Sequence, residues 1–123
     1  MDEQDIEMLK DKTISLAIFT YKPSERPESR EAAIKELRKY INRVRKYEKQ
    51  KKLPKCKYFS LTHLSQGGNW HHHIIFAAAA EVQEICAFWK KGIWAVQEDL
   101  PPNLKEEALS YFLIESKIQK NKS

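Results

Sequence analysis

Three of the four histidines in the chain are consecutive, from His71 to His73, and the fourth, His63, lies eight residues earlier. Side chains alternate in direction along a β-strand, so a strand would place His71 and His73 on one side and His72 on the other. The Cα atoms of His71 and His73 would be about 6.5 Å apart, which lets two imidazoles lean together around one cation. The pattern predicts a metal site on His71 and His73.

His63 is a less direct candidate for a third ligand. A turn before the triplet would bring it opposite the pair, but strict alternation places it on the same side as Phe59 and Leu61. A β-bulge, or a strand that ends at Thr62, would turn it toward the pair. The alternative for the histidines is a structural role, although protonated neighbouring imidazoles repel each other, and this favours a bound cation.

Tyr111 is a candidate nucleophile. A C-terminal helix would place it on one stripe with Glu107, Glu115 and Ile118. A phenol has a pKa of about 10, so it attacks a phosphate at neutral pH only with help from a metal, a cation or a base. A divalent ion beside it would polarise the scissile phosphate. The alternative is core packing, because the adjacent Phe112 is apolar.

Hydrophobic periodicity and turn residues predict the element order β-α-β-β-α-β-α. The predicted strands cover residues 13–20, 56–63, 71–76 and the segment GIWAVQED after Gly92. The predicted helices run from about Arg30 to Lys51 with Ser29 as N-cap, over about 80–90, and over 104–119 with Asn103 as N-cap.

These elements predict one α+β domain over residues 1–123, with a ferredoxin-like antiparallel sheet and helices packed on one face of it. Residues 1–12 are polar and acidic, and we expect them to be flexible or to cover an edge strand. No apolar run is long enough to span a membrane, and the N-terminus has no signal-peptide pattern. Two cysteines without CxxC spacing are typical of a reducing compartment, so the predicted location is the cytoplasm.

The net charge is +5, and residues 38–57 contain ten Lys or Arg against one acid, Glu48. Such a block attracts phosphates, although a solvated basic helix face is the alternative. The predicted DNA contacts are Arg38, Arg43, Arg45, Lys46, Lys49 and, from the last helix, Lys117.

Five segments, in this order, resemble those of the HUH superfamily of rolling-circle replication initiators, which occur in small phages, plasmids and some archaeal viruses. The segments are SLAIFTY, AAIKELRKYINRVRKY, KYFSLTHLSQGGNWHHHIIF, EICAFWKKGIWAVQED and LSYFLIESK. The third is similar to the family's hairpin with a histidine, a hydrophobic residue and a histidine. The fifth is similar to the helix that carries its catalytic tyrosine.

The resemblance implies that His71 and His73 are metal ligands, with His72 in the hydrophobic middle position. His63 falls where many relatives have a glutamate or another polar ligand. Tyr111 corresponds to the nucleophile, which in the family becomes joined to the 5′-phosphate of the cut strand.

The chain departs from the family at two places. A histidine, His72, replaces the usual aliphatic or aromatic middle residue. Where relatives often carry a lysine one turn after the tyrosine, this chain has Ile114 and Glu115. Lys117 lies about 120° around the helix from Tyr111, which puts its reach to the phosphate in doubt.

The sequence therefore predicts a metal-dependent endonuclease that nicks and rejoins single-stranded DNA, at an origin or a hairpin, through a 5′-phosphotyrosine. The expected ion is Mn²⁺ or Mg²⁺, with imidazole ligands favouring Mn²⁺. No GxxxxGK[ST] loop is present, so a host or viral helicase and polymerase would act in trans. A homodimer is compatible with the sequence. The alternatives are a non-catalytic DNA-binding module with a structural metal, and a nucleotide hydrolase that uses water.

Overall fold

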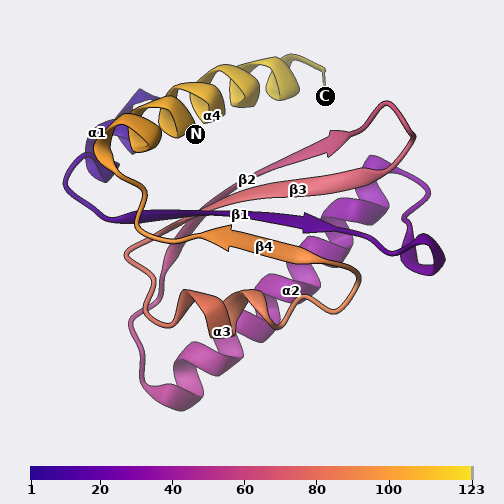
Figure 1. The fold of residues 1–123 in the computed structure, drawn as a ribbon, viewed down its shortest axis with the longest axis horizontal. Coiled ribbons are helices and arrows are strands. Elements are labelled where there is room, and N and C mark those ends of the chain that lie inside the picture. The colour runs from indigo at the N-terminus through magenta and orange to yellow at the C-terminus, as the bar shows by residue number, and fades with distance from the viewer. Residues whose placement is uncertain (123) are drawn as a thin grey trace.

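Four antiparallel strands form the central sheet of the protein (Figure 1). The computed structural model describes the backbone of residues 1–122 and the side chains of residues 1–119. The sheet has the order β2-β3-β1-β4, in which the two central strands are β3 and β1. The strands are β1 (Ile14–Thr20), β2 (Lys57–Leu64), β3 (Trp70–Ala77) and β4 (Trp94–Gln97). This order is that of a ferredoxin-like sheet, and the predicted α+β class is confirmed.

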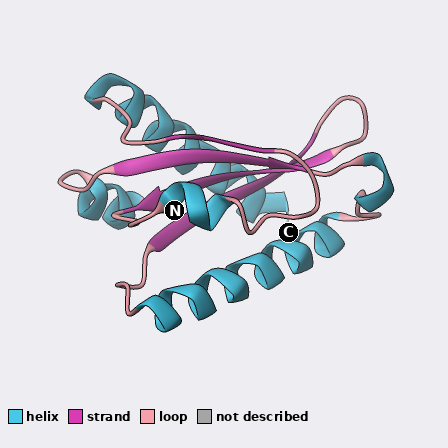
Figure 2. Cartoon of the chain, turned by 60° about the horizontal axis from the view of Figure 1, so that its bottom comes forward, coloured by secondary structure: helices cyan, strands magenta, loops and turns pink. Residues whose placement is uncertain are grey.

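Helices cover both faces of this sheet. In Figure 1, α1 (Glu3–Leu9) and α4 (Pro102–Lys122) lie above it, and α2 (Arg30–Lys51) and α3 (Val82–Cys86) lie below it. Figure 2 shows the sheet between helices from another direction. A short 3₁₀ helix (Pro23–Glu25) precedes α2. None of the helices over the described residues is long and apolar enough to cross a membrane.

The expectation that all helices pack on one face is therefore wrong, and the central strand β3 gives the reason. Consecutive residues Ile74, Ile75 and Phe76 are all buried, so this part of the strand does not alternate between apolar and polar side chains. Ile74 and Phe76 pack with α2 and α3, whereas Ile75 packs with Leu9 of α1 and Phe112 of α4. Strands that are buried on both faces require a helical layer on each side.

Helix α2 has the predicted bounds because its local signals agree. The hydroxyl of Ser29 accepts a hydrogen bond from the Ala32 amide, which caps the N-terminus. The helix ends at Lys52, which adopts the left-handed conformation with φ of 56°. Apolar residues at helical spacing are buried against the sheet, including Leu37, Tyr40 and Val44.

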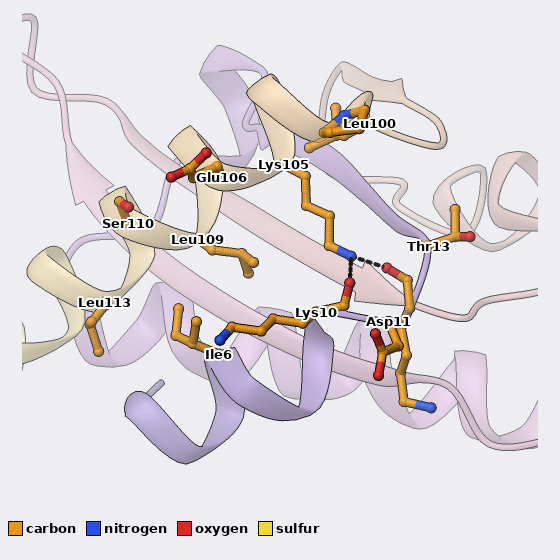
Figure 3. Close-up of a pocket in the computed structure, with 12 residues that line it drawn as sticks. Ile6, Lys10, Asp11, Thr13, Leu100, Lys105, Glu106, Leu109, Ser110 and Leu113 are labelled. Carbon is orange, nitrogen blue, oxygen red and sulfur yellow. Dashed lines mark hydrogen bonds between the residues drawn. The ribbon is translucent and has the colours of Figure 1, made fainter.

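Helix α1 was not predicted, although Asp2 and Asp5 form a capping box at its N-terminus. The side chain of Lys105 in α4 donates hydrogen bonds to the backbone carbonyls of Lys10 and Lys12, just after α1 (Figure 3). These contacts attach the N-terminal segment to the sheet face beside α4 and leave a cavity of about 670 Å³ between the two helices.

Helix α4 begins earlier than expected, because Pro102 is its first residue and the predicted N-cap, Asn103, lies inside its first turn. Proline is favoured at the first helical position, where its missing N–H is not needed. Cys56 and Cys86 are both free and buried.

Gly92 is required by a close backbone approach between β1 and the segment before β4. A Cβ atom at this position would lie 2.2 Å from the carbonyl oxygen of Thr20 and 2.8 Å from the amide nitrogen of Lys22. We expect Gly92→Ala to lower the free energy of unfolding by about 3 kcal/mol, because the obstacle is backbone and cannot move aside. Urea denaturation measures this loss. Gly67→Ala is the matched control, since its Cβ would meet only side-chain atoms at 3.9 Å or more.

Candidate active site

The pairing of β2 with β3 brings three histidines together on one face of the sheet. His63 lies directly opposite His71, and His73 is two residues further along the same strand. The ring centroids are 5.5 Å apart for His63 and His71, 5.2 Å for His63 and His73, and 5.0 Å for His71 and His73. We call these three residues the histidine cluster.

The structure removes the objection that alternation raised against His63. Phe59 and Leu61 do lie on the same face as His63, but this is also the face of His71 and His73, because Leu61 pairs with His73. Helices α1 and α4 bury Leu61, which is only 2% exposed, and leave His63 partly open at the other end of the strand. One face is thus apolar at one end and carries imidazoles at the other, without a bulge.

Tyr111 projects from α4 toward the histidine cluster. Its hydroxyl oxygen lies 3.3 Å from Nε2 of His63, and its ring centroid lies 6.4 Å from that of His73. Its side chain is 43% exposed, whereas the next residue, Phe112, is 1% exposed and packs into the core. Phe112 therefore supplies the packing at this point of α4, and the phenol of Tyr111 remains accessible beside the imidazoles.

The surroundings of Tyr111 disfavour its phenolate form. Partial burial raises the pKa of Tyr111, and the negative charge of Glu115, one helical turn later, raises it further. A phenol with a raised pKa needs a positive charge nearby before it attacks a phosphate. Among its aromatic neighbours, only the histidine cluster could hold such a charge.

The histidines of the cluster favour their neutral forms. Burial lowers the pKa of His73 to about 4, and the charges of His71 and His63 contribute to this shift. Burial and then the charge of His71 also lower the pKa of His63. A neutral imidazole offers a nitrogen lone pair, and metal binding requires that form.

His72 points away from the cluster, to the opposite face of the sheet. It is fully buried, and its ring nitrogens lie 2.7 Å from the hydroxyl of Tyr21 and 2.8 Å from the hydroxyl of Thr62. Both polar atoms of the ring therefore have partners inside the core. The triplet divides into two partly exposed imidazoles and one buried structural histidine, as strand alternation requires.

The buried His72 makes the metal-free protein sensitive to acid. Its folded pKa is lowered to about 4, first by burial and then by the charges of His71 and His73, whereas an unfolded histidine has a pKa of about 6.5. The unfolded chain therefore binds a proton first. Stability from neutral His72 is complete above pH 6.5 and is lost as pH falls toward 4, by about 3 kcal/mol.

Chemical denaturation at pH 7 and pH 4, with a chelator present, measures this loss. His72→Gln keeps a donor and an acceptor for its two partners but does not titrate. We expect its stability to fall less between the two pH values, by about the same 3 kcal/mol. An unchanged pH dependence in this variant would contradict the assignment.

The spacing of the histidine cluster fits a shared metal ion. With a metal–nitrogen distance of about 2.1 Å and a ring radius of about 1.1 Å, two imidazoles on one ion have centroids about 4.5 Å apart at right angles and about 5.2 Å apart in a tetrahedron. The observed separations of 5.0 to 5.5 Å agree with the wider geometry. Within the described residues, however, no three His, Cys, Asp or Glu side chains are arranged as they stand to hold an ion. Ring position and donor direction are different quantities, and rotation of the side chains changes the second more than the first.

The basic residues predicted to bind DNA are not gathered at this site. Those of α2 belong to the helical layer on the far side of the sheet from the histidine cluster (Figure 1). The guanidinium of Arg43 donates to the carbonyl of Phe88, and that of Arg45 pairs with Glu48 at 2.8 Å. Lys117 pairs with Glu3 of α1 at 3.3 Å. Arg38, Lys46 and Lys49 are exposed.

Sequence reasoning missed a cavity of about 490 Å³ that adjoins the histidine cluster. It lies where the C-terminal part of α4 meets β2 and the first residue of α2, Arg30. Its lining includes His63 and Glu115, together with Trp70 and Gln119. No local pattern marks these residues, because they come from three separate regions of the chain and meet only through tertiary packing.

This fold and this site are those of a replication-associated protein. The sequence model of the replication-associated protein family of the ORF2 type matches residues 15–119, a range that contains all four histidines and Tyr111. The chain belongs to this family. Membership indicates a role in the initiation of replication and an interaction with DNA. No curated protein and no solved structure shows significant similarity to the chain.

Proposed function

We propose that the chain is an HUH endonuclease that nicks and rejoins single-stranded DNA to start rolling-circle replication. The observation that carries this proposal is the position of the Tyr111 hydroxyl, 3.3 Å from an imidazole of a three-histidine cluster. A nucleophile and a set of metal-binding groups within reach of one phosphate are what phosphodiester transfer requires. Family membership in replication supports the same class of substrate.

His71, His73 and His63 would hold a divalent ion, Mn²⁺ or Mg²⁺. When bound, this ion would withdraw charge from the scissile phosphate and offset the raised pKa of the neighbouring phenol. The low pKa of His73 and of His63 suits this role, because neither imidazole must first release a proton at neutral pH. Imidazole nitrogens favour Mn²⁺ over the harder Mg²⁺.

Tyr111 carries out the covalent step. Its phenolic oxygen bonds to the phosphorus, the bond from phosphorus to the 3′ oxygen breaks, and the phenolic proton is lost while the departing oxygen takes up one. The products are a 5′-phosphotyrosine and a free 3′-hydroxyl. Rejoining is the reverse: a 3′-hydroxyl attacks the phosphotyrosine, and Tyr111 regains its proton.

The cut strand would lie on the open end of the sheet face, beside α4. Because the sheet separates this face from α2, the exposed Arg38, Lys46 and Lys49 would contact a different stretch of the nucleic acid. Strand separation and synthesis would come from a helicase and a polymerase acting in trans.

The test is a covalent adduct between the protein and labelled, origin-like single-stranded DNA in the presence of Mn²⁺. We expect a species that survives denaturing electrophoresis, and mass spectrometry of its digest should place the nucleotide on Tyr111. A chelator should prevent its formation. Cleavage without an adduct would point instead to a hydrolase that uses water.

The same chelator separates the proposal from a structural metal. The histidine cluster lies outside the two buried apolar clusters of the protein, so we expect the metal-free protein to remain folded. Circular dichroism on heating should show a cooperative transition in the chelator. Loss of the fold on metal removal, without adduct formation in Mn²⁺, would favour the non-catalytic binding module.

A further inference from the structure

The cavity of about 490 Å³ at the edge of β2 has no part in the chemistry described above. It shares His63 and Glu115 with the surroundings of Tyr111. A group that occupies it would therefore lie within one nucleotide of the reacting phosphate. Its volume is typical of sites that enclose a small ligand.

The side chain of Gln119 holds the walls of this cavity in place. Its amide oxygen accepts a hydrogen bond from Arg30 at 3.1 Å, and its amide nitrogen donates one to the carbonyl of Thr62 at 3.0 Å. One residue thus links α4 to α2 and to β2. A cavity whose walls are linked in this way has little to reorganise when a ligand binds.

Apolar side chains at the cavity offer contact to a flat ring. Leu64 and Ile118 are 55% and 40% exposed, which is unusual for large aliphatic residues, and both line the cavity together with the indole of Trp70. Bases of a single strand stack on such surfaces, and aromatic rings are the strongest partners.

The charged groups of the cavity favour a base over a phosphate. Two carboxylates, Glu31 and Glu115, and one guanidinium, Arg30, line it. The carboxylates would repel a phosphate but accept hydrogen bonds from ring N–H and amino groups. Guanine presents the most such donors, at N1 and N2, and its O6 and N7 accept from arginine.

We propose that this cavity binds a guanine base next to the scissile phosphate and so sets the sequence at which the strand is cut. Trp70 and the aliphatic pair contact the base faces, the carboxylates accept from N1 and N2, and Arg30 donates to O6 or N7. This inference rests on the proposed nicking function, because it assumes that the strand passes the histidine cluster.

The experiment measures base preference without cleavage. The full chain, in a chelator, selects from a random-sequence single-stranded DNA pool, and the bound fraction is sequenced. We expect guanine to be enriched at one position. Inosine at that position, which lacks the N2 amino group, should weaken binding about tenfold. This substitution leaves the protein unchanged, so a folding defect cannot produce the result.

Protein variants then assign the preference to the cavity. In Glu115→Gln, the preference for guanine over inosine should fall about tenfold, whereas Arg26→Gln, an exposed arginine outside the cavity, should retain it. Absence of any guanine position, equal binding of inosine, or failure to bind the pool would overturn the inference.

Adduct formation in Mn²⁺, measured separately, distinguishes the two proposals. An adduct without a guanine preference leaves nicking intact and removes the guanine site. A guanine preference without an adduct supports the cavity as a binding site and contradicts the nicking function.

Discussion

Tyr111→Phe should abolish the covalent protein–DNA product and lower the rate of nicking by at least about 10³-fold, because it removes the attacking oxygen. The change should leave the fold intact. The side chain is 43% exposed, and the lost hydroxyl is 3.3 Å from a single partner, His63. We expect the free energy of unfolding to change by less than about 0.5 kcal/mol. Denaturing electrophoresis of protein incubated with labelled DNA and Mn²⁺ measures the product.

Tyr58→Phe is the matched control for this substitution. Tyr58 lies on β2, and its ring packs on the α2 side of the sheet beside Arg45, away from the histidine cluster. The same loss of a phenolic hydroxyl should leave adduct formation unchanged. If Tyr111→Phe still forms an adduct at the wild-type level, the nucleophile is another residue and the assignment fails.

Loss of one imidazole from the histidine cluster should have the next largest effect. We expect His71→Ala or His73→Ala to weaken Mn²⁺ binding by at least about 100-fold, since even changes of groups that only support a ligand cost 10- to 100-fold. His63→Ala should act in the same direction, because its ring lies within 5.5 Å of both others. Calorimetric titration with Mn²⁺ in the absence of DNA gives the affinity directly.

The histidine triplet contains its own control. His72→Gln removes an imidazole adjacent to both ligands, but from the opposite face, where it contacts Tyr21 and Thr62. Mn²⁺ affinity should therefore stay within a fewfold of wild type. Equal losses in His72→Gln and His73→Ala would mean that the metal is not held by the face that we propose.

The basic face of α2 shows how charge composition and site location can separate. The run of lysines and arginines predicts nucleic-acid contact, yet the histidine cluster lies on the other side of the sheet from this helix. At the histidine side, the charged groups beside His63 are Arg30, Glu31 and Glu115. Counts along the chain cannot assign a helix to one face, because that choice depends on which residues of the strands are apolar.

Local rules account for what could be predicted from the sequence alone. Strand alternation places His71 and His73 on one side and His72 on the other, and the structure follows it. Capping by Ser29 and the apolar spacing of α2 set the bounds of that helix. Each of these signals involves neighbours within a few residues, where covalent geometry determines direction.

Tertiary packing decided the rest. His63 joins the cluster because the hairpin register pairs it with His71, and alternation within one strand does not contain the register. Tyr111 reaches His63, 48 positions away, only because α4 packs over the face that Leu61, Ile75 and Phe112 share. That face exists because β3 is apolar on both sides, and burying both sides requires two helical layers. The direction of each side chain is thus set locally, whereas its neighbours are set by which apolar surfaces the whole chain must bury.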